Sequence, residues 1–392
     1  MRRRLWRDAS LPAVVAGFVA VLVGYTSSVA IVFEAARAVG ADAAHTASWL
    51  MALGLGMGLT SIALSLAYRQ PVLTAWSTPG AALVAASSGL SLPEATGAFV
   101  VCALLIVAAG ATRLFERVMD RIPVALAAAL LAGVLARFGL DAVLAAGSAP
   151  SLVLAMALAY LAGRRAWPRY AVPGVLACGV AVAAAQGALR LDGVSLAFAT
   201  PQWTTPAFSA GAIVGVALPL FLVTMASQNL PGVAAQRASG YDTPVSPVVT
   251  TTGVATLLLA PFGGFALNLA AITAAICMGR EAHEDPSRRY VAAVAAGVFY
   301  VLLGLAGGAV AGLLAAFPRE LVVAVAGLAL LGTIAGGLAA ALKDEAHRDA
   351  AALTFLVSLS GLTVAGIGSA FWGLAAGSVA LFVQQWRRTR GR

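Results

Sequence analysis

The amino-acid sequence predicts an all-α polytopic membrane protein with fourteen transmembrane segments arranged as a seven-plus-seven inverted repeat. Of its 392 residues 61% are hydrophobic and 10% are charged, and the mean hydropathy is +0.92. An ordinary soluble domain carries about 25% charged residues. Apolar runs of about 15 to 22 residues recur along the whole chain, and about 20 helical residues span the hydrocarbon core of a bilayer. The other two observations are the placement of the basic residues and a pair of interrupted apolar segments.

Hydropathy divides the chain into segments that short charged or Pro/Gly-rich links separate. The fourteen segments lie at 12–32, 47–67, 72–90, 93–111, 122–139, 148–163, 171–188, 207–227, 245–260, 261–279, 291–315, 319–341, 350–367 and 370–386. The first follows a basic head, as in a signal peptide, but its apolar run exceeds the usual signal core. We therefore expect it to remain as the first span, and we expect the lipid bilayer to surround the whole chain.

The basic residues test this count, because cytoplasmic loops of membrane proteins collect Lys and Arg. With fourteen segments, all but four of the 25 Lys and Arg residues fall on the side that holds both chain ends. The exceptions are Arg37, Arg137, Arg190 and Arg319, and acids outnumber them on their side. Both termini are therefore predicted to be cytoplasmic. Because the basic residues lie in short links between spans, we expect no nucleic-acid partner.

Two apolar segments are interrupted in the same way. QPVLTAWSTPGAALVAASSG at 70–89 and LLLAPFGGFALNLAAITAAICMG at 257–279 carry Pro and Gly where a spanning helix should be continuous. They belong to the third and tenth segments, each the third of its set of seven. Because seven is odd, the two sets are inverted, and matched interruptions in inverted repeats indicate a binding site. We expect each chain to enter extended and to begin a half-helix near Thr78–Pro79 and near Gly264–Phe265.

Two such half-helix starts would face one cavity, where free N–H groups and partial positive charge favour an anion. Extended backbone at this depth is tolerable only beside protein or a water-filled cavity. The candidate substrate-binding residues are polar, aromatic or backbone-exposing positions near these starts and in two neighbouring segments. They are Tyr25, Ser28, Trp76, Ser77, Thr78, Pro79, Gln228, Asn229, Gly263, Gly264, Phe265, Ala266 and Asn268.

Simpler structural interpretations remain open for several of these residues. Gln228 and Asn229 could cap the eighth helix at the cytoplasmic surface before Pro231. The hydroxyls of the first segment could bond to the preceding helical turn. Trp76 and Phe265 could sandwich a flat ring, or could be ordinary core aromatics.

Enzymatic chemistry, metals and cofactors are not expected. Cys102, Cys178 and Cys277 all lie inside apolar segments without metal-binding spacing. None of the sixteen acids falls in the middle of a predicted span. The parts of a paired-acid or Ser/His/Asp enzyme are therefore missing at depth, as is the buried carboxylate relay of many proton-driven carriers.

Four stretches resemble the benzoate/proton symporter family, the BenE-type aromatic-acid transporters of bacterial inner membranes. They are YRQPVLTAWSTPGAALV, LPLFLVTMASQNLPGVAAQRASGYDTPVSP, NLAAITAAIC and LTVAGIGSAFWGLAAG, and the resemblance runs from about Ala13 to Trp386. It implies an inner (plasma) membrane carrier that takes up benzoate or a related aromatic carboxylate with protons, and it leaves a homodimer open. It also implies distant kinship with nucleobase and sulfate-type transporters of seven-plus-seven fold.

The resemblance to those transporters further implies a core domain and a gate domain. Residues 1–111 and 207–316 would form the core, with the half-helices, and residues 112–190 and 317–392 the gate. Nucleobase carriers often place carboxylates in the eighth and tenth segments, where this chain has Gln228–Asn229 and Gly264–Ala266. Neutral groups suit a carboxylate substrate, which acidic side chains would repel.

The expected mechanism is alternating access by an elevator or rocking motion. We expect the substrate ring between Trp76 and Phe265, and its carboxylate near the amides of Thr78 and of Gly264–Ala266. The proton would travel on the substrate or through a peripheral group such as Glu34. A passive or exchange-type anion channel or transporter is the alternative function, and a membrane scaffold without transport is a more distant one.

Overall fold

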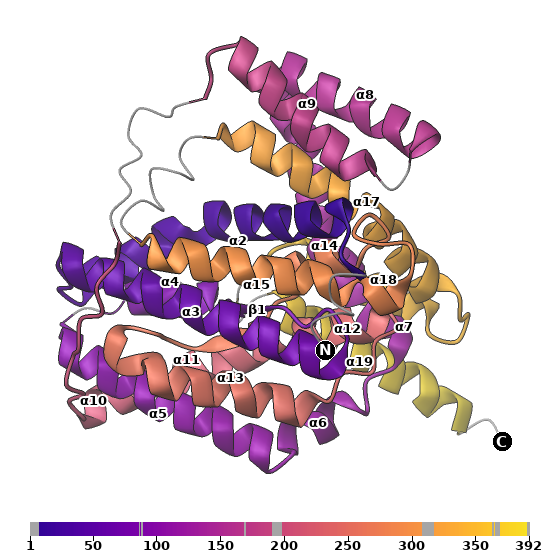
Figure 1. The fold of residues 1–392 in the computed structure, drawn as a ribbon. Helices are drawn as coiled ribbons and strands as arrows, with labels where there is room; N and C mark the ends of the chain where they lie inside the picture. Colours follow the sequence, from indigo (N-terminus) through magenta and orange to yellow (C-terminus); the bar gives the residue numbers. More distant parts are fainter. Residues whose placement is uncertain are drawn as a thin grey trace.

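The computed structural model describes residues 8–85, 87, 89–167, 170–189, 198–307, 317–362, 364 and 369–389, so Arg190 lies outside it. Helices make up nearly all of this part, and the longest ones run side by side (Figure 1). Within the described residues, seven helices are long and apolar enough to cross a membrane, and three shorter apolar helical stretches accompany them. The prediction of a helical multi-pass membrane protein is confirmed at this level. The count of fourteen and the inverted repeat stay predictions.

Each predicted segment coincides with a helix or with a strand followed by a helix. In the first half these are α2 (Leu11–Ala38), α3 (Ala43–Tyr68), β1 (Thr74–Trp76), α4 (Thr78–Ala85), α5 (Leu92–Ala111), α6 (Leu114–Met119), α7 (Val124–Leu144), α8 (Pro150–Ala166) and α9 (Ala171–Ala185). In the second half they are α10 (Ala210–Ala212), α11 (Leu218–Thr224), α12 (Leu230–Ala238), α13 (Val245–Leu259), β2 (Leu267–Leu269), α14 (Ile272–Met278), α15 (Tyr290–Leu305), α17 (Arg319–Leu342), α18 (Arg348–Leu359) and α19 (Ser369–Thr389).

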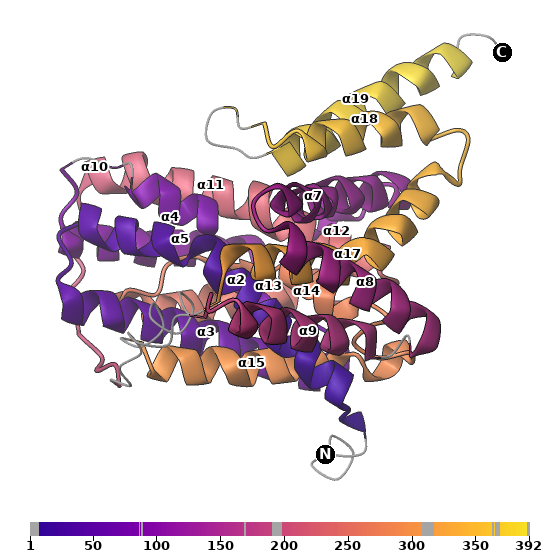
Figure 2. The same ribbon diagram turned by 90° about the horizontal axis from the view of Figure 1, so that it is seen from above.

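The helices form two packing groups. In the first, which we name the core group (α2–α5 and α10–α15), α3 and α2 pack on α15, and α5 packs on α13. In the second, the gate group (α7–α9 and α17–α19), α7 packs on α17 and α18, and α8 packs on α9. Helices α18 and α19 form a hairpin at the edge of the molecule, beyond α7 (Figure 2). The names follow the predicted core and gate domains, whose relative motion stays a prediction.

Small residues allow the closest helix contact in the core group. A Cβ atom added at Gly54 of α3 would lie 2.6 Å from the Cα atom of Gly304 in α15. Backbones can approach this closely only where both residues lack side chains, and such contacts are a main source of helix association in membranes. The abundant glycines of the sequence therefore serve packing, at least along this pair of helices.

The two interrupted segments pair with each other as a two-stranded antiparallel sheet. Thr74 lies opposite Leu269, and Trp76 lies opposite Leu267. The ladder extends at both ends, because the Ala270 amide donates to the Leu73 carbonyl at 2.9 Å and the Ser77 amide donates to the Ala266 carbonyl at 3.0 Å. The extended backbone thereby satisfies one edge of each strand inside the protein, as burial away from water requires.

Side chains from the surrounding helices satisfy the other edge of each strand. The Thr74 amide donates to Ser61 Oγ of α3 at 3.0 Å. On β2, the Leu267 amide donates to Thr256 Oγ1 of α13, and the Leu269 amide donates to Asn229 Oδ1, both at 2.9 Å. Single polar residues on apolar helices, which would be costly facing lipid, are here the partners of buried strand amides.

The first half-helix begins at Thr78, as predicted, but its cap differs by one residue. Ser77 is the N-cap: its Oγ accepts from the Gly80 amide at 3.2 Å, and its carbonyl accepts from the Ala81 amide at 2.8 Å. Thr78 and Pro79 therefore occupy the first two helical positions, where the missing proline N–H costs nothing.

The predicted start of the second half-helix at Gly264–Phe265 is wrong. Helix α14 begins at Ile272, because Leu267–Leu269 is taken up by pairing with β1. The Gly pair marks the beginning of the extended part instead of its end, with Gly263 in the left-handed region at φ 92°.

The eighth segment does not end near residue 227. It continues as a π-helical turn, Met225–Asn229, and then as α12 to Ala238. Pro231 lacks an N–H group and cannot make the usual bond to the fourth preceding residue, and a wider turn is one way for a helix to pass such a position. Capping of a helix end by Gln228 and Asn229 before Pro231 is therefore excluded.

The orientation predicted from the basic residues can be tested with single cysteines. Thr205→Cys, in an exposed stretch before α10, is expected to react with a membrane-impermeant thiol reagent in intact cells. Ser239→Cys, directly after α12, is expected to react only after the cells are permeabilised. Labelling of position 239 in intact cells would contradict cytoplasmic termini and the fourteen-segment count.

Candidate functional site

A cavity of about 250 Å³ lies where the starts of α4 and α14 come together. Both packing groups contribute to its wall. The lining residues are Val23, Gly24, Ser28, Met57, Ala75, Trp76, Thr78, Pro79, Val134, Phe138, Ser227, Gln228, Pro231, Ala270, Ala271, Ile272, Thr273, Tyr300 and Ser369. None of these lining residues carries a charge, so the wall consists of apolar and aromatic surface with a few neutral polar groups.

The Trp76 indole forms a fixed part of this wall. Its Nε1 donates to Ser28 Oγ at 3.0 Å, and Ser28 Oγ donates in turn to the Gly24 carbonyl at 2.8 Å. The indole also packs edge-to-face against Tyr25, with ring centroids 4.8 Å apart. Trp76 is 4% exposed, so these contacts hold a flat apolar surface in one orientation beside the cavity.

The first turns of α4 and α14 contribute backbone amides to the cavity wall. In α14 the first intrahelical bond runs from the Ala275 amide to the Ala271 carbonyl. The amides of Ile272 and Thr273 therefore have no carbonyl of their own helix to bond. Thr78 occupies the equivalent place in α4, after its Ser77 cap. Unbonded first-turn amides of this kind are donors suited to an anionic oxygen.

Gln228 adds a side-chain donor to these amides. It lies in the π-helical turn Met225–Asn229, is partly exposed, and lines the cavity. Among the described residues its amide has no hydrogen-bond partner, in contrast to neighbouring Asn229, whose Oδ1 accepts from the Leu269 amide. The Gln228 amide is therefore available to a ligand, whereas Asn229 holds β2 in place.

The structure places five predicted site residues at the cavity: Ser28, Trp76, Thr78, Pro79 and Gln228. The other eight do not line it: Tyr25, Ser77, Asn229, Gly263, Gly264, Phe265, Ala266 and Asn268. Phe265 is fully buried and packs against Trp49 and Phe99, with ring centroids 6.0 and 5.8 Å apart. The predicted sandwich of a substrate ring between Trp76 and Phe265 is therefore not formed.

Buried residues near the cavity have structural roles of their own. Tyr25 is fully buried behind Trp76, and its hydroxyl has no hydrogen-bond partner. Asn268, on β2, is also fully buried, and its Nδ2 donates to the Ala266 carbonyl at 3.3 Å. Burial, and not polarity alone, separates these residues from those that can touch a ligand.

Sequence reasoning missed lining residues of two kinds. Ala271 and Thr273 were missed because the second half-helix starts eight residues later than predicted. Phe138 of α7 and Tyr300 of α15 were missed because they lie in uninterrupted apolar helices. The NLAAIT run could have indicated the first pair, since it ends in Thr as the LTAWST run does, but only packing brings the second pair to the cavity.

Comparison with known proteins identifies the family. A family model described as benzoate membrane transport protein matches residues 7–383. The chain belongs to this family. The benzoate membrane transport protein of Acinetobacter baylyi is 41% identical to it over 382 residues, which cover 97% of each chain. Inner membrane protein YdcO of Escherichia coli K12 is 50% identical over 382 residues, which cover 97% of this chain and 98% of YdcO.

Membership of the benzoate membrane transport family makes the chain a homologue of membrane transporters and not of enzymes, as the sequence predicted. More remote likenesses are found among solved structures, both at 14% identity. The transmembrane domain of the cyanobacterial bicarbonate transporter BicA matches with a TM-score of 0.45, over 94% of this chain and 97% of that one. SLC26A9 matches with a TM-score of 0.48, over 97% of this chain and 66% of that one.

Proposed function

We propose that this chain imports benzoate or a closely related aromatic carboxylate, together with protons, across a bacterial inner membrane by alternating access. The observation that carries the proposal is the uncharged, aromatic-walled cavity between the two half-helix starts. Its volume of about 250 Å³ lies at the lower end of small-molecule sites, which favours a single-ring ligand. A relative named for benzoate transport supports the same substrate class.

The groups of the cavity wall suit the two halves of an aromatic acid. The apolar ring would lie against Trp76 and Phe138, which face the cavity from different packing groups. The carboxylate would accept hydrogen bonds from first-turn amides of α4 and α14 and from the Gln228 side chain. This arrangement replaces the contacts first expected for Phe265 and for Gly264–Ala266.

The proposed proton route is the substrate itself. No acid lines the cavity, and Glu34, the peripheral candidate, is exposed on α2. An aromatic carboxyl group should titrate near the range of side-chain carboxyls, at about 4. Protonation would remove the charge that crosses the membrane, so the uncharged wall supports entry of a proton with each substrate molecule.

Uptake into proteoliposomes tests this function. With an acidic exterior, the parent protein is expected to accumulate benzoate above its external concentration, and aliphatic acids of similar size are expected to compete poorly. Trp76→Ala, which removes the flat wall, should weaken benzoate binding more than tenfold, or about 1.4 kcal/mol. Downhill equilibration without accumulation would favour the passive or exchange-type anion pathway. Normal binding by Trp76→Ala would contradict this site.

A further inference from the structure

An ion pair joins the two packing groups close to the end of α14. Glu281 follows this helix in the core group and accepts a hydrogen bond from Arg164 Nη1, at the end of α8 in the gate group, at 2.8 Å. The Glu281 side chain is 5% exposed and that of Arg164 is 42% exposed. Across the described part of the chain, Glu281 is the only buried acid. A buried carboxylate depends strongly on its partner, because an unpaired charge is costly away from water.

The gate group supplies a fitted slot for this carboxylate. On α17, a Cβ atom added at Gly332 would lie 3.0 Å from Glu281 Oε1, so glycine leaves room for the oxygen. On α8, the Arg164 guanidinium lies over the Tyr160 ring, 5.8 Å from its centroid. Glu281 therefore reaches from the core group into a position shaped by two gate helices.

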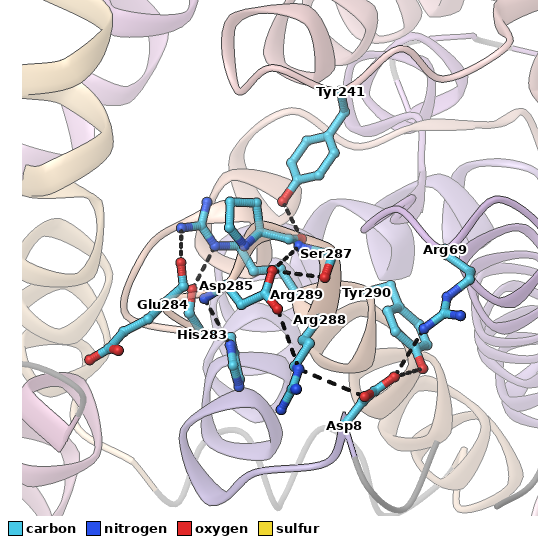
Figure 3. A network of polar contacts seen from close by, with 11 residues as sticks. Asp8, Arg69, Tyr241, His283, Glu284, Asp285, Ser287, Arg288, Arg289 and Tyr290 are labelled. Carbon is cyan, nitrogen blue, oxygen red and sulfur yellow. Dashed lines mark hydrogen bonds and ion pairs between the residues drawn. The ribbon is translucent and has the colours of Figure 1, made fainter. Parts of the chain in front are cut away.

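On the core side, the loop that carries Glu281 is braced to α14 by a buried arginine. The Arg289 guanidinium donates to the carbonyls of Met278, His283 and Glu284 at 2.8, 2.7 and 3.2 Å (Figure 3). The Met278 carbonyl belongs to the last residue of α14, where a cation also complements the helix dipole. The loop is thus expected to move with α14.

We propose that the Glu281–Arg164 pair is a latch between the core and gate groups, closed in this conformation and opened once in each transport cycle. The proposal rests on the alternating access of the proposed function. Helix α14 spans only seven residues: its start lines the cavity, and the latch carboxylate follows its end. A movement of the core group past the gate group would draw Glu281 away from both Arg164 and Gly332.

Cross-linking tests whether the latch must open. In a chain without native cysteines, Arg164→Cys and Glu281→Cys are joined by a short, reducible bifunctional thiol reagent. The link is expected to lower benzoate uptake more than tenfold, to leave the benzoate dissociation constant within threefold, and to be reversed by reduction. The matched control links Arg137→Cys to Asp141→Cys, an ion pair within α7, and should leave uptake unchanged. Full uptake by the linked latch, or failure of its cysteines to link, would overturn the proposal.

A second measurement needs no substrate. In a chain that keeps only Cys277, which is buried on α14, Arg164→Gln and Glu281→Gln should raise the rate of Cys277 labelling at least threefold, because α14 is released from the gate. Arg164→Lys, which keeps the charge, should label like the parent. The exposed neighbours Arg165→Gln and Glu284→Gln are the controls.

The two measurements separate the latch from the proposed function. Equal labelling of Cys277 in all variants would overturn the latch. A parent protein that takes up no aromatic acid, but whose labelling follows the expected pattern, would overturn the function and leave the latch standing.

Discussion

Gln228→Glu is expected to weaken benzoate binding about a hundredfold at neutral pH, which corresponds to about 2.7 kcal/mol. The substitution keeps the shape of the side chain and adds a negative charge to a wall that has none. Two like charges 4 Å apart repel by about 4 kcal/mol at an effective dielectric constant of 20. The expected loss is smaller than this figure because the substituted side chain is partly exposed and can turn away from the substrate.

Acidification should reverse part of this loss. A glutamic acid side chain ordinarily has a pKa of about 4.3. Lowering the pH from 8 to 5 therefore begins to protonate the introduced carboxyl and removes the repulsion in that fraction of molecules. The benzoate affinity of Gln228→Glu, corrected for ionisation of benzoate, should rise more steeply toward low pH than that of the parent.

Dissociation constants measured between about pH 5 and 8 check this prediction. Gln228→Leu is the control, because it removes the amide donor without adding a charge and should change affinity by the same factor at every pH. Indistinguishable curves for the parent and Gln228→Glu would mean that the carboxylate of the substrate lies elsewhere in the cavity or outside it.

Gly263→Ala is expected to abolish accumulation of correctly folded protein. Gly263 adopts φ 92°, which side-chain-bearing residues rarely take, and a Cβ atom there would lie 1.7 Å from Cδ1 of Trp49. Trp49 cannot yield easily, because it is 1% exposed and packs against Phe99 with ring centroids 5.5 Å apart. Relief of the clash would have to displace an aromatic cluster or the turn that leads into β2.

Gly240→Ala separates the clash from the backbone conformation. Gly240 has φ 82°, close to that of Gly263, but no atom lies within 4 Å of its added Cβ. Its substitution should cost only the conformational strain, about 1 to 2 kcal/mol. The measurements are the yield of monodisperse protein in detergent and its thermal unfolding temperature. A normal yield and unfolding temperature for Gly263→Ala would show that the close packing of Trp49 on this turn is not required.

Hydropathy and helix-breaking residues predicted the segments and the existence of two matched interruptions, because both are local signals. They could not predict where the second half-helix begins. Pro261 and Gly263 mark an interruption, but the length of the extended chain after it is set by pairing of Leu267–Leu269 with β1, almost two hundred residues away. A contact between distant segments has no local signature in one sequence, and the predicted start was therefore too early.

Aromatic residues show the same limit within the site. Trp76 and Phe265 look equivalent in the sequence, since each is an aromatic residue beside an interruption. In the structure Ser28 orients Trp76 at the cavity wall, whereas Trp49 and Phe99 enclose Phe265 in the core. Residue type indicated a ring-binding site, and only packing decided which rings could reach it.

The side-chain-bonded sheet of β1 and β2 has a consequence for the thermodynamics of a carrier. Backbone bonds tie the two half-helices to each other, and Ser61, Thr256 and Asn229 tie the strands to α3, α13 and the eighth segment. Because every bond broken in a dry interior is costly, we expect these elements to travel as one body. The amides that hold a substrate would then keep their spacing whichever side of the bilayer they face. Such a carrier binds its cargo equally well from both compartments, so the electrochemical gradients alone decide the direction of net flow.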